Sequence, residues 1–142
     1  MIIELLTAEQ LTKEIQQQAA ELYRQLNATN KQRPLSEVLE ASNKVLVAIC
    51  KIDESLVGMA LLSTYKVISG YRGLVEDVIV DTSQRGKGIG RKLMEKLLDE
   101  GKNLGLNEIL LFTGHHRKPA ITLYGNLGFI KKDSGIYHLK FT

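Results

Sequence analysis

The chain has 142 residues, of which 44% are hydrophobic and 25% charged, with a net charge of +3, and these values are ordinary for a soluble globular protein with a substantial core. No apolar run approaches the roughly 20 residues that a membrane helix needs, and the N-terminus lacks the basic region and cleavage site of a secretory signal. The single cysteine, Cys50, excludes an internal disulfide framework and is typical of a reducing compartment, so we expect a cytoplasmic protein.

The first expected elements are a short strand at residues 2–6 and a helix after it. Thr7 and Gln10 have the spacing of a capping box, which predicts that the helix begins there. Its apolar face recurs every three or four residues, at Leu11, Ile15, Ala19, Leu22 and Leu26. The chain shows no repeat, low-complexity tract or linker, so we predict a single domain over residues 1–142.

The middle of the chain is predicted to form an antiparallel meander. A polar loop at 27–34 ends in Pro34 and leads to a short helix near 35–42. Aliphatic runs separated by polar turns then predict three strands, at 44–51, 55–67 and 73–81.

The last third of the chain is predicted to alternate helices and strands. A helix at about 88–103 has an apolar face that includes Leu93, Met94, Leu97, Leu98 and Gly101. A continuously apolar strand at 108–112 is expected to be buried on both faces. Pro119 favours the start of a helix near 118–126, and strands near 129–132 and 136–141 close the chain. This order predicts an α/β fold with a mixed, mostly antiparallel sheet of about seven strands and a parallel crossover over 74–112.

A loop before the helix at 88–103 alternates glycines with basic residues. Amides at a helix N-terminus lack intrahelical acceptors and lie at the positive end of the helix dipole, so such a loop is suited to bind an anion. Glycines let the backbone approach phosphate oxygens, and basic side chains add charge-assisted contacts. A plain strand–helix connection is the alternative. The residues are Arg85, Gly86, Lys87, Gly88, Gly90, Arg91 and Lys92.

Two common phosphate-binding motifs do not fit this loop. A P-loop needs glycine where Arg85 stands, and Lys-Ser/Thr where Arg91 and Lys92 stand. A Rossmann fingerprint that starts at Gly86 needs its third glycine at the position of Arg91. A binder of ATP or NAD that uses the loop in another way is kept as an alternative.

The spacing Arg85-x-x-Gly88-x-Gly90 resembles the R/Q-x-x-G-x-G/A motif of the GNAT superfamily of acyl-CoA-dependent N-acetyltransferases. An aliphatic strand, VIVD, precedes the motif, as in that family. The segment AITLYGNLGF at 120–129 is similar to the family's A-x-x-x-Y-x-x-x-G-F pattern. The resemblance covers essentially the whole chain, and it implies a GNAT fold, acetyl-CoA as co-substrate, no metal, and transfer of an acetyl group to an amine.

The resemblance also implies which residues contact coenzyme A. In the family, main-chain groups of the strand before the loop pair with the pantetheine arm, so the strand residues need only be apolar. Loop amides hold the pyrophosphate, with the side chain of Lys87 or Arg91 available to the phosphates. The implied strand residues are Val78, Ile79 and Val80, and the implied loop residues are Arg85, Gly86, Lys87, Gly88, Ile89, Gly90 and Arg91.

Two residues are candidates for the proton transfers of the reaction. The family's tyrosine at the position of Tyr124 contacts the leaving sulfur, although helical spacing alone equally indicates a core tyrosine with its hydroxyl hydrogen bonded. Glu76 is the candidate base, and it stands nine residues before Arg85, as in the glucosamine-6-phosphate acetyltransferase branch. Its neighbour Asp77 is expected to point to the opposite face of the strand. A structural role for Glu76, or an ordered water chain as base, is the alternative.

One position departs from the family pattern. Arg117 stands seven residues before Tyr124, where many members carry an Asn that bonds the pantetheine arm. Arg117 therefore contacts CoA or the acceptor in its own way, or the contact is missing. His115 and His116 are adjacent, which poorly suits joint ligation of one metal, so we expect a solvated loop and leave open a base or acceptor-binding role for one of them.

The acceptor amine is not specified by the sequence. A small amine or amino sugar is favoured over a protein lysine, and the alternative function is a non-catalytic acyl-CoA-binding regulatory module. Neither a nucleic-acid partner nor a membrane is indicated, and a homodimer is an open alternative because dimers are common in the family. Acceptor contacts are expected from the 65–73 turn and from the first two helices and their loop, whose basic residues hint at an acceptor with a carboxylate or phosphate. They include Tyr23, Arg24, Lys31 and Arg33.

Overall fold

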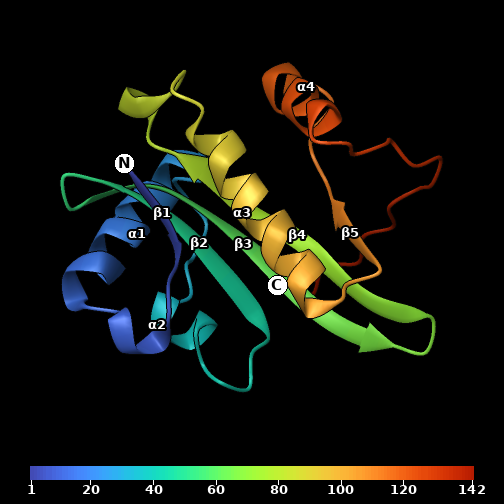
Figure 1. Ribbon diagram of the computed structural model, residues 1–142, viewed down its shortest axis with the longest axis horizontal. Helices are drawn as coiled ribbons and strands as arrows, with labels where there is room; N and C mark the ends of the chain where they lie inside the picture. Colours follow the sequence, from blue (N-terminus) through green and yellow to red (C-terminus); the bar gives the residue numbers. More distant parts are fainter. The chain divides into compact units, whose positions relative to one another are not determined.

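Aliphatic strands pair into one mixed sheet in the computed structural model, which describes residues 1–142 (Figure 1). The first four strands pair antiparallel in chain order, and the fifth runs parallel to the fourth. The predicted meander and the predicted parallel crossover are therefore confirmed. The strands are β1 (Ile2–Leu5), β2 (Val45–Ile52), β3 (Ser55–Val67), β4 (Gly70–Val80) and β5 (Glu108–Leu111).

Four α-helices complete the fold. Their bounds are α1 (Lys13–Leu26), α2 (Leu35–Val38), α3 (Ile89–Leu104) and α4 (Lys118–Asn126). The predicted start of the first helix is wrong by about one turn. Gln10 Oε1 accepts from the amide of Thr7 at 3.1 Å, but this pair closes only the 3-10 turn Ala8–Gln10. The α1 helix begins later because the hydroxyl of Thr12 caps it, accepting from the amide of Ile15 at 3.1 Å.

The helices of the first 112 residues cover both faces of the sheet. On one face, α1 and α2 pack on the strands through Ala19, Leu22 and Leu35, while Leu26 at the end of the predicted apolar face is exposed. On the other face, α3 packs through side chains that are at most 1% exposed, and burying each contributes about 1.5–3 kcal/mol. Those side chains are Ile89, Leu93, Met94 and Leu97, while the predicted core residue Leu98 is half-buried.

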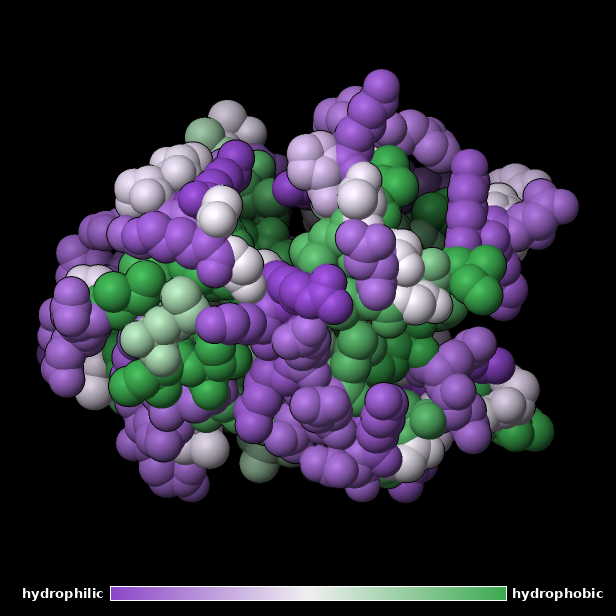
Figure 2. Space-filling model, turned by 45° about the horizontal axis from the view of Figure 1, so that its top comes forward, coloured by the Kyte–Doolittle hydropathy of each residue, from purple (hydrophilic) through white to green (hydrophobic).

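The chain forms two compact units, Met1–Phe112 and Thr113–Thr142. The first holds the sheet with α1, α2 and α3, and the second holds α4. On the face drawn in Figure 2, hydrophilic residues cover most of the surface and hydrophobic residues form smaller patches. No helix is long and apolar enough to cross a membrane.

The two C-terminal strands that the sequence predicts do not form, so the sheet has five strands and not seven. Residues 129–132 and 136–141 have strand-like composition, but a strand requires a partner to pair with, and this segment joins no ladder. As the edge strand, β5 is half-buried at Ile109 to Leu111, and Phe112 after it is 61% exposed. The expectation that this strand is buried on both faces is therefore wrong.

Candidate functional site

A β-bulge interrupts β4 near the middle of the sheet. In β3, Met59 and Leu61 are two residues apart, but their partners in β4, Ile79 and Glu76, are three residues apart. One extra β4 residue is therefore inserted between these pairs. Asp77 lies in the bulge at φ 48°, a left-handed conformation that few residues other than glycine adopt. Bulges of this kind re-aim side chains.

The bulge changes the expected positions of the two carboxylates. Strict alternation would send Glu76 and Asp77 to opposite faces of β4. Paired residues of neighbouring strands lie on the same face of a sheet, so Glu76 shares the face of its partner Leu61, which lines the same cavity as Asp77. The bulge therefore places both residues on one face. The carboxylate in the cavity wall is Asp77, which is half-buried, whereas the Glu76 side chain is exposed and outside the lining. Burial raises the pKa of Asp77, and burial together with the charge of Asp77 raises the pKa of Glu76.

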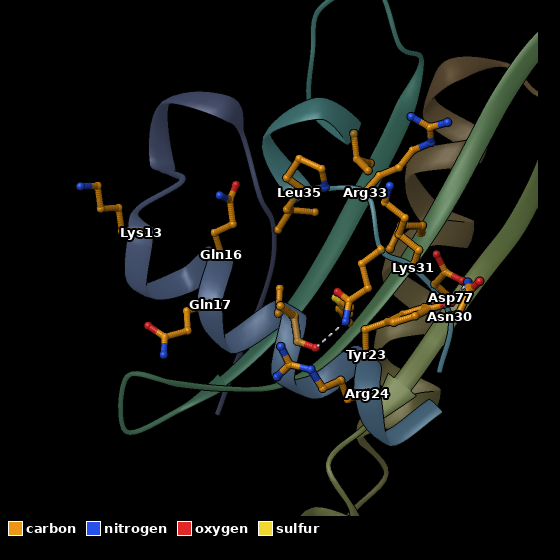
Figure 3. A pocket seen from close by; sticks show the side chains of 17 residues that line it. Lys13, Gln16, Gln17, Tyr23, Arg24, Asn30, Lys31, Arg33, Leu35 and Asp77 are labelled. Atoms are coloured by element: carbon orange, nitrogen blue, oxygen red, sulfur yellow. Dashed lines mark hydrogen bonds between the residues drawn. The ribbon is translucent and has the colours of Figure 1, made fainter. Parts of the chain in front are cut away.

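The cavity has a volume of about 910 Å³ and lies between α1, the 27–34 loop, α2 and the sheet (Figure 3). Its neutral polar wall is fixed by two hydrogen bonds. The Asn30 amide donates to the hydroxyl of Tyr23 at 2.8 Å, and Gln32 Nε2 donates to the carbonyl of Ala20 at 3.0 Å. All four predicted acceptor-side residues line the cavity, and the 65–73 turn contributes none of the lining. Those four residues are Tyr23, Arg24, Lys31 and Arg33.

The glycine loop adopts a conformation that requires glycine at two positions. Gly86 has φ 82° and Gly88, the N-cap of α3, has φ 76°, and a Cβ at either would meet no atom within 4 Å. The helical hydrogen-bond ladder begins only at Lys92, whose amide donates to the carbonyl of Gly88 at 3.1 Å. The amides of residues 85–91 donate to no backbone acceptor, so the loop presents a row of free donors beside open space.

The basic side chains of the loop are exposed and lightly engaged. Lys87 Nζ donates to Gln84 Oε1 at 2.6 Å, and Arg91 pairs with Glu95 one helical turn later at 2.8 Å. Arg85 forms no ion pair, and Ile89, the first residue of α3, is buried. Exposed pairs of this kind contribute less than about 1 kcal/mol, so a bound anion can compete for these cations.

The sheet opens beside the loop. β5 pairs with β4 only from Arg72 to Val75, and β4 continues to Val80 with β3 as its sole partner. The main-chain groups on the β5 side of residues 76–80 therefore face no strand. Of the three predicted strand residues here, Ile79 is buried against the α1 side, while Val78 and Val80 are half-buried. An extended ligand can use this edge as an additional strand would.

The remaining predicted site residues belong to the second unit. Tyr124 in α4 is half-buried, its ring packs edge-on against Phe129 with centroids 6.0 Å apart, and burial raises its pKa. The positive charge of Arg117 acts on that pKa in the opposite direction. Arg117, His115 and His116 are all exposed on the segment before α4. The chain has no cluster of three or more His, Cys, Asp or Glu side chains arranged to hold a metal ion.

Comparison with known proteins bears on the whole chain. A model of the acetyltransferase (GNAT) family matches residues 4–129. The Uncharacterized N-acetyltransferase YobR of Bacillus subtilis is 33% identical over 82 residues, which are 58% of this chain and 33% of that protein. The L-amino acid N-acyltransferase MnaT of Escherichia coli is 31% identical over 74 residues, 51% of this chain and 43% of that protein. The matches thus span less than half the length of these relatives.

The fold has a solved counterpart along its full length. The aminoglycoside N-acetyltransferase AAC(6')-Iy in complex with CoA superposes with a TM-score of 0.77 at 20% identity, covering 99% of this chain and 100% of the other. Together with the match to the family model, this confirms the α/β fold that the loop motif and element order predict. The number of strands is the detail that differs.

Proposed function

Because the chain belongs to the acetyltransferase (GNAT) family, we propose that it transfers an acetyl group from acetyl-CoA to a primary amine by direct attack in a ternary complex. The observation that carries the proposal is the loop at the start of α3, with free amides at residues 85–91 beside a strand edge that no other strand covers. A diphosphate matches the amides, and an extended amide-bearing arm matches the edge. A related fold binds CoA, as the AAC(6')-Iy complex shows for that protein.

The residues that contact the co-substrate fall into two groups under this proposal. The main chain of Val78, Ile79 and Val80 pairs with the arm, and the loop from Arg85 to Arg91 holds the phosphates. Arg85 adds charge without first leaving an ion pair, whereas Lys87 and Arg91 exchange their weak exposed contacts for the anion. Arg117 is proposed as a further contact to CoA or acceptor, because it replaces the family's Asn.

The chain also supplies groups for the two proton transfers. In the reaction a C–N bond forms, the thioester C–S bond breaks, and the amine loses the proton that the leaving thiolate can accept. A carboxylate of the bulge is the proposed base: Glu76 has the family spacing, and Asp77 has the place in the cavity wall. The raised pKa of each brings it closer to that of the amine it deprotonates. Tyr124, a neutral hydroxyl at working pH, is the proposed donor to the leaving sulfur.

The test is release of free thiol from acetyl-CoA in the presence of a panel of primary amines that includes amino acids, amino sugars, polyamines and lysine peptides. Thiol release above the hydrolysis seen without amine is expected for at least one class. Hydrolysis-level release with every amine, together with thermal stabilisation by acetyl-CoA, would instead identify a non-catalytic acyl-CoA-binding module. A larger thermal shift with ATP or NAD than with CoA would refute the assignment of the loop.

A further inference from the structure

The cavity beside α1 has an uneven charge distribution. Its lining contains one carboxylate, Asp77, and four basic side chains, and the rest is neutral or apolar. The apolar part of the lining includes Met59 and Leu61 of β3. The basic residues are Lys13, Arg24, Lys31 and Arg33.

One of these four cations, Lys31, forms no ion pair and lies near the end of the cavity that contains Asp77. Arg33 is held by Glu37 at 2.8 Å, and Glu37 lies outside this cavity. Lys13 begins α1 and lies ten residues before Tyr23, roughly 15 Å along the helix axis. Arg24 forms no salt bridge either, but its side chain points away from Asp77, on the other side of Tyr23. Lys31 forms no salt bridge and follows Asn30, whose side-chain amide donates to the hydroxyl of Tyr23 at 2.8 Å. Figure 3 draws Asp77 at the same end of the cavity as Tyr23 and Asn30.

The single carboxylate has no partner within the protein. Asp77 forms neither a salt bridge nor a hydrogen bond through its side chain, although it is half-buried in a bulge whose backbone is in a disfavoured conformation. A carboxylate that is partly removed from water without a partner is destabilising unless a cation joins it. The bulge therefore holds an acceptor for a positively charged group, at the end of the cavity where Lys31 has no ion-pair partner.

We infer that the cavity selects a small acceptor that carries both a primary amine and an anionic group, a carboxylate or a phosphate. The ammonium binds at Asp77, and the anionic group binds at Lys31. This inference rests on the proposed acetyl transfer, for which it names the acceptor class. A cavity of about 910 Å³ is within the range of small-ligand sites. A protein lysine brings no anion attached to its own side chain, so it leaves Lys31 unpaired.

The experiment compares amines in matched pairs that differ only in the anion. O-phosphoethanolamine is paired with ethanolamine, and β-alanine with β-alanine amide, so that one arm tests a phosphate and the other a carboxylate. Charge-assisted contacts contribute about 1.5–3 kcal/mol, so kcat/KM for the anionic member of at least one pair is expected to be on the order of tenfold to a hundredfold higher. Equal or higher values for both neutral amines would overturn the inference.

Paired variants locate the anion site. Lys31→Met is expected to raise KM for the anionic amine and to remove most of the difference between the members of the pair, because it deletes the charge and keeps the length of the stem. Lys13→Met deletes the same charge from the same cavity outside the proposed site, and it is expected to leave the difference intact. Both side chains are exposed, so neither change disturbs the core. An equal loss of discrimination in the two variants would contradict a site at Lys31.

A binding measurement separates this inference from the proposed function. Calorimetric titration of the protein with O-phosphoethanolamine and with ethanolamine requires no turnover. Tighter binding of the phosphorylated amine, lost in Lys31→Met, supports the acceptor site even if no amine releases thiol, a result that would refute acetyl transfer alone. Thiol release that favours neutral amines, with no tighter binding of the anionic ones, would refute the acceptor class and leave the transfer reaction standing.

Discussion

Replacing Gly88 with alanine tests the loop that begins α3, because the change acts through the backbone alone. Gly88 has φ 76°, and a Cβ there would meet no heavy atom within 4 Å, so the cost is conformational and not steric. A left-handed L-residue costs about 1–2 kcal/mol. At about 2.1 cal/mol/K per residue, the unfolding entropy of 142 residues is roughly 0.3 kcal/mol/K, so Tm is expected to fall by about 3–7 °C.

Gly105→Ala is the matched control for this change. Gly105 has φ 83° and equally open surroundings, but it caps the opposite end of a 16-residue helix, about 24 Å away. The two variants should lose similar stability in thermal unfolding. Only Gly88→Ala should weaken the binding of CoA in a calorimetric titration, because only this change alters the amide donors of the loop. Equal affinities for CoA in the two variants would refute the assignment of the loop as the phosphate site.

Three further changes test other parts of the structure. Asp77→Asn should raise Tm at pH 7, because burial raises the pKa of Asp77 and the fold therefore disfavours its ionised form. The gain in Tm should vanish as the pH falls toward about 3.9, the pKa of an unperturbed Asp, where the carboxyl group is protonated. A gain of equal size at pH 7 and pH 4 would contradict this explanation. Tyr124→Phe should lower turnover on the order of a hundredfold in the thiol assay and preserve the thermal shift with CoA, while an unchanged rate would remove Tyr124 from the mechanism. Gly73→Ala should lower the free energy of unfolding by about 1–3 kcal/mol in urea titrations, since its Cβ would lie 2.7 Å from Cδ1 of the buried Leu62. A loss below about 0.5 kcal/mol would show that the side chains around Gly73 rearrange to accommodate the methyl group.

The strongly patterned elements were predictable from the sequence. The strand expected at 55–67 and the helix expected at 118–126 have the bounds that the structure shows, because aliphatic runs between polar turns and a proline at a helix start are local signals. The conformation of the glycine loop was predictable as well, since Gly86 and Gly88 stand where the chain takes a positive φ before α3. These local patterns, combined with the order of the elements, were sufficient for the fold class.

The position of the carboxylates was not predictable, because it depends on an inserted residue. The rule that side chains alternate along a strand assumes regular pairing with the neighbouring strand. Nothing in the sequence around Asp77 indicates that β4 has a bulge opposite β3. The prediction of two C-terminal strands was wrong for a related reason. Ile136 to Phe141 have the composition of a strand, but whether they pair depends on partners distant in sequence.

The opening of the sheet after Val75 has a consequence for the protein without ligand. An unpaired strand edge is a template on which another chain can add a strand and aggregate. Between Glu76 and Val80 the edge bears two consecutive carboxylates and a bulge, both of which hinder flat edge-to-edge pairing. The carboxylates and the bulge at this open edge therefore disfavour the addition of a strand from a second copy of the chain.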